Sequence, residues 1–284
     1  MATVLLQWSV GGLFFLWITT RRREVGLGYG WLLRGTYLVL AAGGALAGFR
    51  YGFVPVRDIG AIAVVVAALG ALVVSIVYRR AGVSDASVEH DRRSERIAAM
   101  TGIERADRAG DRSASREFPP VLDLVAPVAG TVGLVAAAVD AAEPGSGSVW
   151  VSLLRTLVGA AFLGAVTDAM LLGHWYLVQP GLPRRHLNEL VRWLGWIWPL
   201  EVVALLLPTG MLSVFSGSID DGWGGQLGWF WALCAITTIV LVLVTRAALR
   251  ERYYSAVMAA TGLLYLAILT AFGTDLVARA VLDI

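Results

Sequence analysis

Apolar runs of about 20 residues recur along most of this 284-residue chain, and they constrain its fold more than any other feature. Each run is long enough to cross a hydrocarbon core about 30 Å thick as a helix. Hydrophobic residues make up 57% of the sequence and the mean hydropathy is +0.70, whereas roughly 45–50% is usual in soluble domains. The runs are continuously apolar rather than alternating, which disfavours a β-barrel. The sequence therefore predicts an all-α, polytopic bundle of transmembrane helices.

We expect eight spans in a single membrane domain. Residues 1–80 hold the first three, residues 121–284 hold the other five, and a long segment rich in both charge signs, residues 81–120, lies between them. No internal repeat relates the two groups of spans. The expected spans are Val4–Thr20, Tyr29–Phe49, Ile59–Tyr78, Val121–Ala142, Val149–Val178, Leu194–Phe215, Leu227–Leu249 and Tyr254–Leu282.

Arginine is concentrated in alternate loops, which predicts the orientation of the chain. All 23 basic residues are arginine, and most of them lie after the first, third, fifth and seventh spans. The alternate stretches Val54–Asp58, Glu143–Ser148 and Ser216–Gln226 hold one, none and none. Because basic loops stay in the cytoplasm, both termini should lie outside and the charged segment inside. The lack of lysine is typical of GC-rich coding and suggests the inner membrane of a bacterium. The first run has no basic residues before it, so we interpret it as a retained helix rather than a cleaved signal peptide.

Composition also removes several classes of function. The single cysteine, Cys234, excludes an internal disulfide and any multi-cysteine metal site. The chain contains no P-loop, GxGxxG, HExxH or GxSxG motif. A haem held by two intramembrane histidines is disfavoured, because only His174 is expected at lipid depth. We therefore expect no enzyme activity, no cofactor, no bound metal and no nucleic-acid partner.

Two carboxyl side chains, Asp168 and Glu201, lie within apolar spans. An ionisable group in hydrocarbon is costly and is usually retained for a function. With the sixth span starting at Leu194, antiparallel packing brings both carboxyls to a similar depth, where they can face each other. Two close carboxyls resist joint ionisation, so one should hold a proton. Pro199, two residues before Glu201, should break the helix beside it, as in many transport sites.

Other ionisable residues also lie within the expected spans. Asp123 and Arg155 complete the predicted substrate or proton path with Asp168, Glu201 and His174. His174 is six residues after Asp168 and points about 120° away from it around an ideal helix; it is either a satisfied interfacial histidine or a proton relay or quinone hydrogen-bond donor. Asp275 and Arg279, four residues apart near the outer end of the last span, should form an ion pair.

Aromatic residues gather on both sides of the loop that follows the fifth span. Two interpretations stay open for them: an aromatic belt at the membrane interface, or the lining of a hydrophobic ligand cleft. The candidate ligand-lining residues are Trp175, Tyr176, Trp196 and Trp198.

Three functions fit these residues. The first is a proton-coupled small-molecule carrier that uses its intramembrane carboxyls. The alternative is a non-catalytic subunit of a respiratory membrane complex that contacts quinone or assists assembly. In the third, a structural or regulatory protein binds a partner through residues 81–120. The expected partners are accordingly membrane lipid, a small molecule or quinone, and another membrane subunit.

Overall fold

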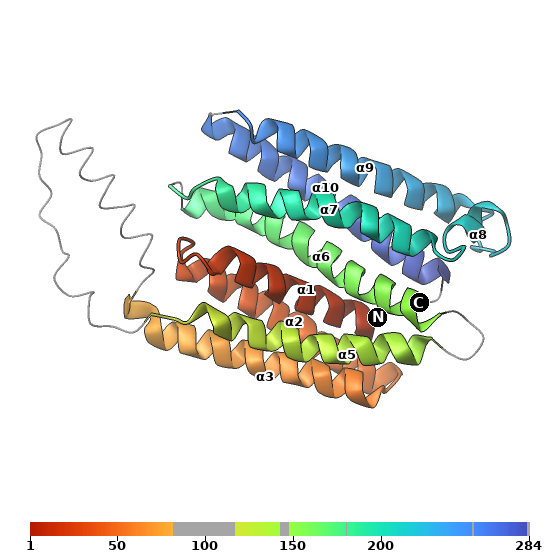
Figure 1. Cartoon of the computed structure of the whole chain (residues 1–284), viewed down its shortest axis with the longest axis horizontal. Coiled ribbons are helices and arrows are strands. Elements are labelled where there is room, and N and C mark those ends of the chain that lie inside the picture. Colours follow the sequence, from red (N-terminus) through yellow and green to blue (C-terminus); the bar gives the residue numbers. More distant parts are fainter. Residues whose placement is uncertain (82–116, 143–147, 180, 252, 283–284) are drawn as a thin grey trace, which may run out of the picture.

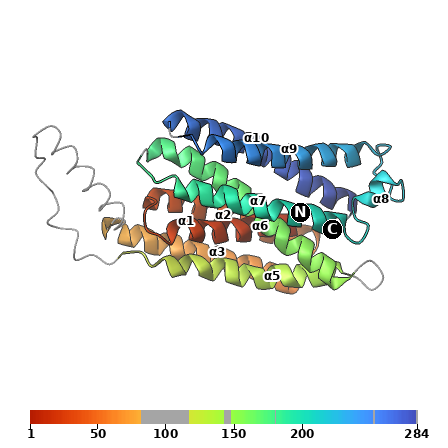
Figure 2. The same ribbon diagram turned by 45° about the horizontal axis from the view of Figure 1, so that its top comes forward.

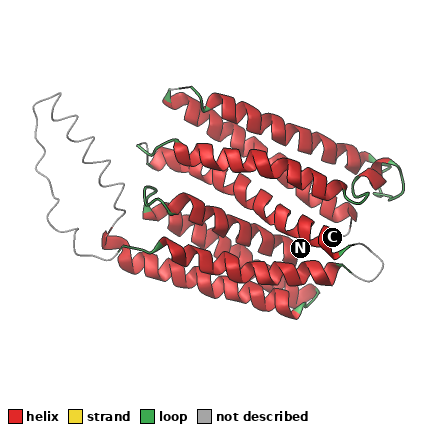
Figure 3. Ribbon diagram, viewed as in Figure 1, coloured by secondary structure: helices red, strands yellow, loops and turns green. Residues whose placement is uncertain are grey.

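A computed structural model describes residues 1–81, 117–142, 148–179, 181–251 and 253–282. These residues form nine α-helices and two short 3-10 helices, with no strand among them (Figure 3). Seven of the helices are long and apolar enough to cross a membrane. The prediction of an all-α, multi-pass membrane protein is thereby confirmed.

The helices follow one another with short connections wherever the chain is described. The seven apolar helices are α1 (Ala2–Thr20), α2 (Leu27–Tyr51), α3 (Pro55–Val77), α5 (Val125–Ala141) with the preceding 3-10 turn η3 (Pro120–Leu124), α6 (Val149–Val178), α9 (Gln226–Ala248) and α10 (Tyr254–Leu282). The others are α7 (Arg185–Leu206), the short α8 (Leu212–Phe215) and the 3-10 turn η1 (Tyr78–Ala81).

The long helices run side by side, with α1 and α6 packed together in the middle of the bundle (Figures 1 and 2). Helices α2, α3 and α5 lie on one side of this pair, and α7, α9 and α10 lie on the other. Both termini and α8 lie at one end. The arginine-rich turns after α1, α6 and α9 lie at the other, which is called the arginine-rich end below.

Glycine lets α1 and α6 approach closely. A Cβ atom on Gly11 would overlap the carbonyl oxygen of Ala160, and one on Gly164 would overlap the backbone of Gly11. In lipid, where no hydrophobic force drives helices together, such small-residue contacts supply much of the packing attraction. The central helix pair therefore depends on these two glycines.

The sixth expected span differs most from the structure. It was expected over Leu194–Phe215, but α7 begins nine residues earlier, at Arg185, and ends at Leu206. Its first half carries charged residues, which is why α7 is not among the seven apolar helices. The prediction recognised only the second half of this helix, which is mostly apolar. The first half is amphipathic, and its Leu187 and Leu190 pack into the core.

Three prolines lie at different points of α5 and α7, or just after them. Pro127 lies in the first turn of α5, where a missing N–H breaks no helical bond. Pro208 follows the end of α7. Pro199 lies in the interior of α7, which continues through it as one helix, so the break predicted there is wrong. Most of the charged segment 81–120, with the partner site expected there, falls outside the described residues.

Candidate functional site

Charged side chains from three helices meet within the bundle, toward the end that holds the termini. On α10, the Arg279 Nε atom lies 2.9 Å from both oxygens of Asp275. The ion pair expected from their spacing is confirmed. Although the pair lies near the end of its helix, it is shielded from solvent, because Asp275 is fully buried and Arg279 is 7% exposed. A buried pair needs further hydrogen bonds to offset the desolvation of both charges.

Arg155 of α6 connects this pair to the end of α7. Its Nε donates to the carbonyl of Ala204 at 3.1 Å, and its Nη2 donates to the carbonyl of Leu207. The last carbonyls of a helix have no partner within the helix, so Arg155 satisfies two of them. Arg279 in turn donates to the backbone carbonyl of Arg155 at 3.3 Å. The two arginines thus link α6, α7 and α10.

Glu201 of α7 is fully buried beside these groups. No hydrogen-bond donor in the described part of the chain reaches either of its carboxyl oxygens. Its charged neighbours are the Asp275 carboxyl and the guanidinium groups of Arg279 and Arg155. Because the Asp275 oxygens already accept from Arg279, an ionised Glu201 would place one anion beside another. We call Arg155, Glu201, Asp275 and Arg279 the four-residue charge cluster.

Two residues that the sequence analysis missed adjoin the cluster. A Cβ atom on Gly159 of α6 would lie 2.5 Å from Arg279 Nη2 and 3.0 Å from Asp275 Oδ1, so only glycine leaves room for the ion pair. Gln7 of α1 is fully buried, and its Nε2 donates to the Thr156 carbonyl at 2.6 Å. Gln7 could have been found from the sequence, because a glutamine in the first turns of an apolar span stands out there.

Asp168 lies elsewhere and does not face Glu201. Its Oδ1 accepts the hydroxyl hydrogen of Tyr37 from α2, and no described donor reaches its Oδ2. Arg155, which is level with the end of α7, is thirteen residues from Asp168, or roughly 20 Å of helix at 1.5 Å per residue. The two carboxyls were expected at a similar depth because the sixth span was predicted to begin at Leu194, whereas α7 begins at Arg185. The carboxyl beside Glu201 is that of Asp275.

Asp123 also has a specific partner. Its two oxygens accept from Arg34 of α2, at 2.7 Å from Nε and 2.8 Å from Nη2, and Thr20 donates to it at 3.2 Å. The Arg34 guanidinium lies over the ring of Phe118, 4.4 Å from its centroid. An arginine within an apolar run was the sequence signal for this pair, and it was missed.

His174 lies on the outside of the bundle. Its side chain is exposed, and its Nδ1 is 3.3 Å from the hydroxyl of Tyr265, which projects from α10. The two rings meet edge to face. His174 therefore joins neither Asp168 nor the four-residue charge cluster.

The candidate aromatic residues separate into two groups. Trp175, Tyr176 and Trp198 make hydrogen bonds between or beside helices, to Gln179, Pro183 and Ala235 respectively. Trp196 is different, because it is 69% exposed and lines an open groove at the arginine-rich end. Only Trp196 of these four lines a described pocket.

Comparison with known proteins finds no matching family model, no similar curated protein and no similar solved structure.

Proposed function

We propose that this multi-pass membrane protein is a proton-coupled carrier of small molecules in which Glu201 binds and releases the coupling proton. One observation carries the proposal: Glu201 is fully buried, no described donor reaches its oxygens, and its main neighbour is another carboxyl. A protonated Glu201 can donate a hydrogen bond to Asp275. An ionised one cannot.

The surroundings of Glu201 offer two arrangements that differ by one proton. With the proton bound, Glu201 donates to Asp275, and Arg155 stays on the carbonyls of α7. Without it, the Glu201 carboxylate is repelled by Asp275 and attracted to Arg155 and Arg279. Since Arg155 holds the end of α7, exchange of its partners would loosen α7 from α6. This couples proton release to a helix movement of the kind that alternating access requires.

Asp168 extends the proposed proton path toward the arginine-rich end. It lies on α6, the helix that also carries Arg155, and its Oδ2 is without a described donor. Asp123 plays a different role in this proposal. Its bidentate pairing with Arg34 holds α2 to η3, which is a structural role.

Proton uptake into vesicles tests the carrier. Full-length protein is reconstituted into liposomes loaded with a pH-sensitive dye, and amino acids, monocarboxylates, sugars and small organic cations are added outside in turn. We expect one class to acidify the lumen with wild-type protein, and E201Q to abolish that response because glutamine cannot exchange a proton.

The matched control is D140N, which removes a carboxyl that is exposed at the end of α5. It should respond like the wild type. Acidification that persists in E201Q contradicts the role of Glu201, and the absence of a wild-type response to all four classes contradicts the carrier itself.

The second candidate function, a quinone-contacting subunit, is favoured by His174 and Tyr265. Their polar atoms lie 3.3 Å apart on exposed side chains of α6 and α10. Such a pair can present a donor and an acceptor to a lipid-soluble carbonyl compound. Copurification with a redox subunit, together with quinone binding that H174A removes, would favour this function over the carrier.

We further propose that the arginine-rich end faces the cytoplasm, which places both termini outside in a bacterial inner membrane. The support is the arginine asymmetry of the loops. Single cysteines introduced at Ser216 and Arg22, in a C234A background, should react with a membrane-impermeant maleimide from opposite sides. Labelling of both from the same side of intact cells contradicts this orientation.

A further inference from the structure

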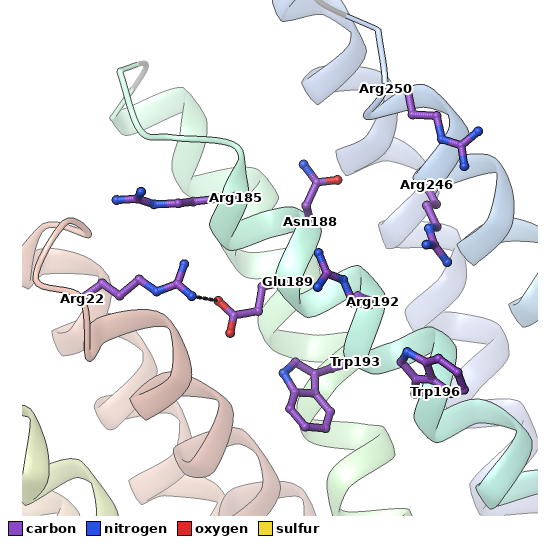
Figure 4. A pocket seen from close by; sticks show the side chains of 9 residues that line it. All are labelled: Arg22, Arg185, Asn188, Glu189, Arg192, Trp193, Trp196, Arg246 and Arg250. Atoms are coloured by element: carbon purple, nitrogen blue, oxygen red, sulfur yellow. Dashed lines mark ion pairs between the residues drawn. The ribbon is translucent and has the colours of Figure 1, made fainter.

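A groove opens at the arginine-rich end, between α7, the end of α9 and the turn after α1 (Figure 4). Its volume is about 710 Å³. On α7 the lining residues recur every three or four positions and so share one face of the helix. The lining consists of Arg22, Arg185, Asn188, Glu189, Arg192, Trp193, Trp196, Arg246 and Arg250.

The groove holds more positive charge than the protein neutralises. Its one acid, Glu189, is paired with Arg21 and Arg22, the latter at 3.2 Å. Three lining arginines have side chains without an ion-pair or hydrogen-bond partner in the described ranges, namely Arg192, Arg246 and Arg250. All three are exposed. Like charges gathered around one groove repel, and a bound anion would remove this repulsion.

Two tryptophans make the groove amphipathic. Trp193 and Trp196 follow Arg192 along α7, deeper toward the middle of the bundle, and are 44% and 69% exposed (Figure 4). Tryptophan is enriched where lipid headgroups meet acyl chains. A soluble phosphate would contact the arginines alone, whereas a phospholipid would also cover the indole rings.

We propose that this groove binds the phosphate headgroup of an anionic phospholipid, held by Arg192 and Arg246 with Arg250, while its acyl chains cover Trp193 and Trp196. Arginine suits phosphate because its planar guanidinium donates two parallel hydrogen bonds. Basic pockets between transmembrane helices are a known setting for such headgroups. The site lies apart from the four-residue charge cluster, so it does not depend on the proposed transport function.

Native mass spectrometry of the full chain in a neutral detergent tests the site. The protein is titrated with phosphatidylglycerol or with phosphatidylcholine of the same acyl chains. We expect the first lipid bound to be phosphatidylglycerol, with at least tenfold preference. The R192Q/R246Q/R250Q variant should bind it about a hundredfold more weakly, since each arginine at an anionic surface contributes roughly fivefold.

Two further variants distinguish binding in the groove from a general effect of surface charge and from misfolding. R79Q removes an arginine that is exposed at the end of α3, outside the groove, and should keep the wild-type preference. R192K/R246K/R250K keeps the charge but loses the paired guanidinium donors, so its affinity should lie between those of the wild type and the triple glutamine variant. Equal binding of both lipids, an unchanged affinity in the triple glutamine variant, or displacement of the lipid by an equal concentration of inorganic phosphate would overturn the proposal.

Discussion

The guanidinium of Arg34 and the carboxylate of Asp123 form a bidentate ion pair, with contacts of 2.7 and 2.8 Å between residues 89 positions apart in the chain. Both side chains are almost completely shielded from solvent. The pair ties α2 to the 3-10 turn that precedes α5. It therefore joins two elements that lie on opposite sides of the long charged segment in the sequence.

Removing one member of this pair should destabilise the fold. D123N leaves the Arg34 charge buried without a counter-ion, and such losses cost about 3–5 kcal/mol. The free energy of unfolding in mixed micelles, measured by titration with sodium dodecyl sulfate, checks the value. D140N removes an exposed carboxylate and should change stability by less than about 0.5 kcal/mol. Equal effects of the two substitutions would contradict this role of the pair.

Loss of the Tyr37 hydroxyl, the one described donor to the Asp168 carboxyl, should lower the stability of the fold. Y37F leaves both carboxyl oxygens of Asp168 without a partner, at a cost of about 1–3 kcal/mol. Y29F is the comparison, because the Tyr29 hydroxyl reaches the Asp168 backbone carbonyl, at 3.5 Å, and not its carboxyl group. The same unfolding titration should show the larger loss for Y37F. A larger loss for Y29F would show that the carboxyl contact is unimportant.

Close packing of α1 and α6 predicts intolerance of a single methyl group. G11A should destabilise the bundle by about 1–3 kcal/mol, because the new Cβ overlaps the Ala160 carbonyl and the helices must separate. A Cβ on Gly262 of α10 meets no atom within 4 Å. G262A should therefore stabilise α10 by up to about 1 kcal/mol through helix propensity. If G11A is as stable as wild type in thermal unfolding, the described approach of α1 and α6 is wrong.

Acid should disorder the turn that begins α9. Asp221 accepts backbone hydrogen bonds from Trp223, Gly225 and Leu227 at 2.8–2.9 Å. The bond from Gly225, with those from Trp223 and Leu227, lowers the pKa of Asp221 below its ordinary value of 3.8. A lowered folded-state pKa contributes stability above the unfolded pKa, and this stability is lost as the pH falls through the folded pKa.

Hydrogen exchange of residues 222–228 measures this effect. Protection should be constant above about pH 5 and fall below the ordinary carboxyl pKa of 3.8. D221N should reduce it at neutral pH, whereas D220N should have a smaller effect because Asp220 accepts only the Gly222 amide. Protection in D221N that matches the wild type would contradict the capping role of Asp221.

The sequence predicted the helical membrane fold because each span satisfies its own backbone and needs only length and apolar content. It failed at α7, whose amphipathic beginning resembles a polar loop. That error of nine residues carried Glu201 to the wrong depth, since each residue adds about 1.5 Å. Where a helix begins sets the depth of its carboxyls, and carboxyls at different depths cannot meet.

The partners of the buried charges could be predicted only when they lie on one helix. Asp275 and Arg279 are separated by four residues, and helical geometry alone brings them together. Arg34 and Asp123 are on different elements, as are Tyr37 and Asp168, so their pairing depends on how helices rotate and cross. For Glu201, the depth in the membrane follows from where α7 begins, but its neighbour Asp275 lies on α10 and depends on how the two helices pack.

Infrared difference spectroscopy of the lipid-reconstituted protein, recorded between low and high pH, tests most directly whether Glu201 holds an exchangeable proton. The account predicts a protonated-carboxyl C=O band in the wild type that disappears as the pH rises, is missing from E201Q and is kept in D140N. If E201Q retains every protonated-carboxyl band of the wild type, Glu201 carries no exchangeable proton and the proposed coupling is wrong.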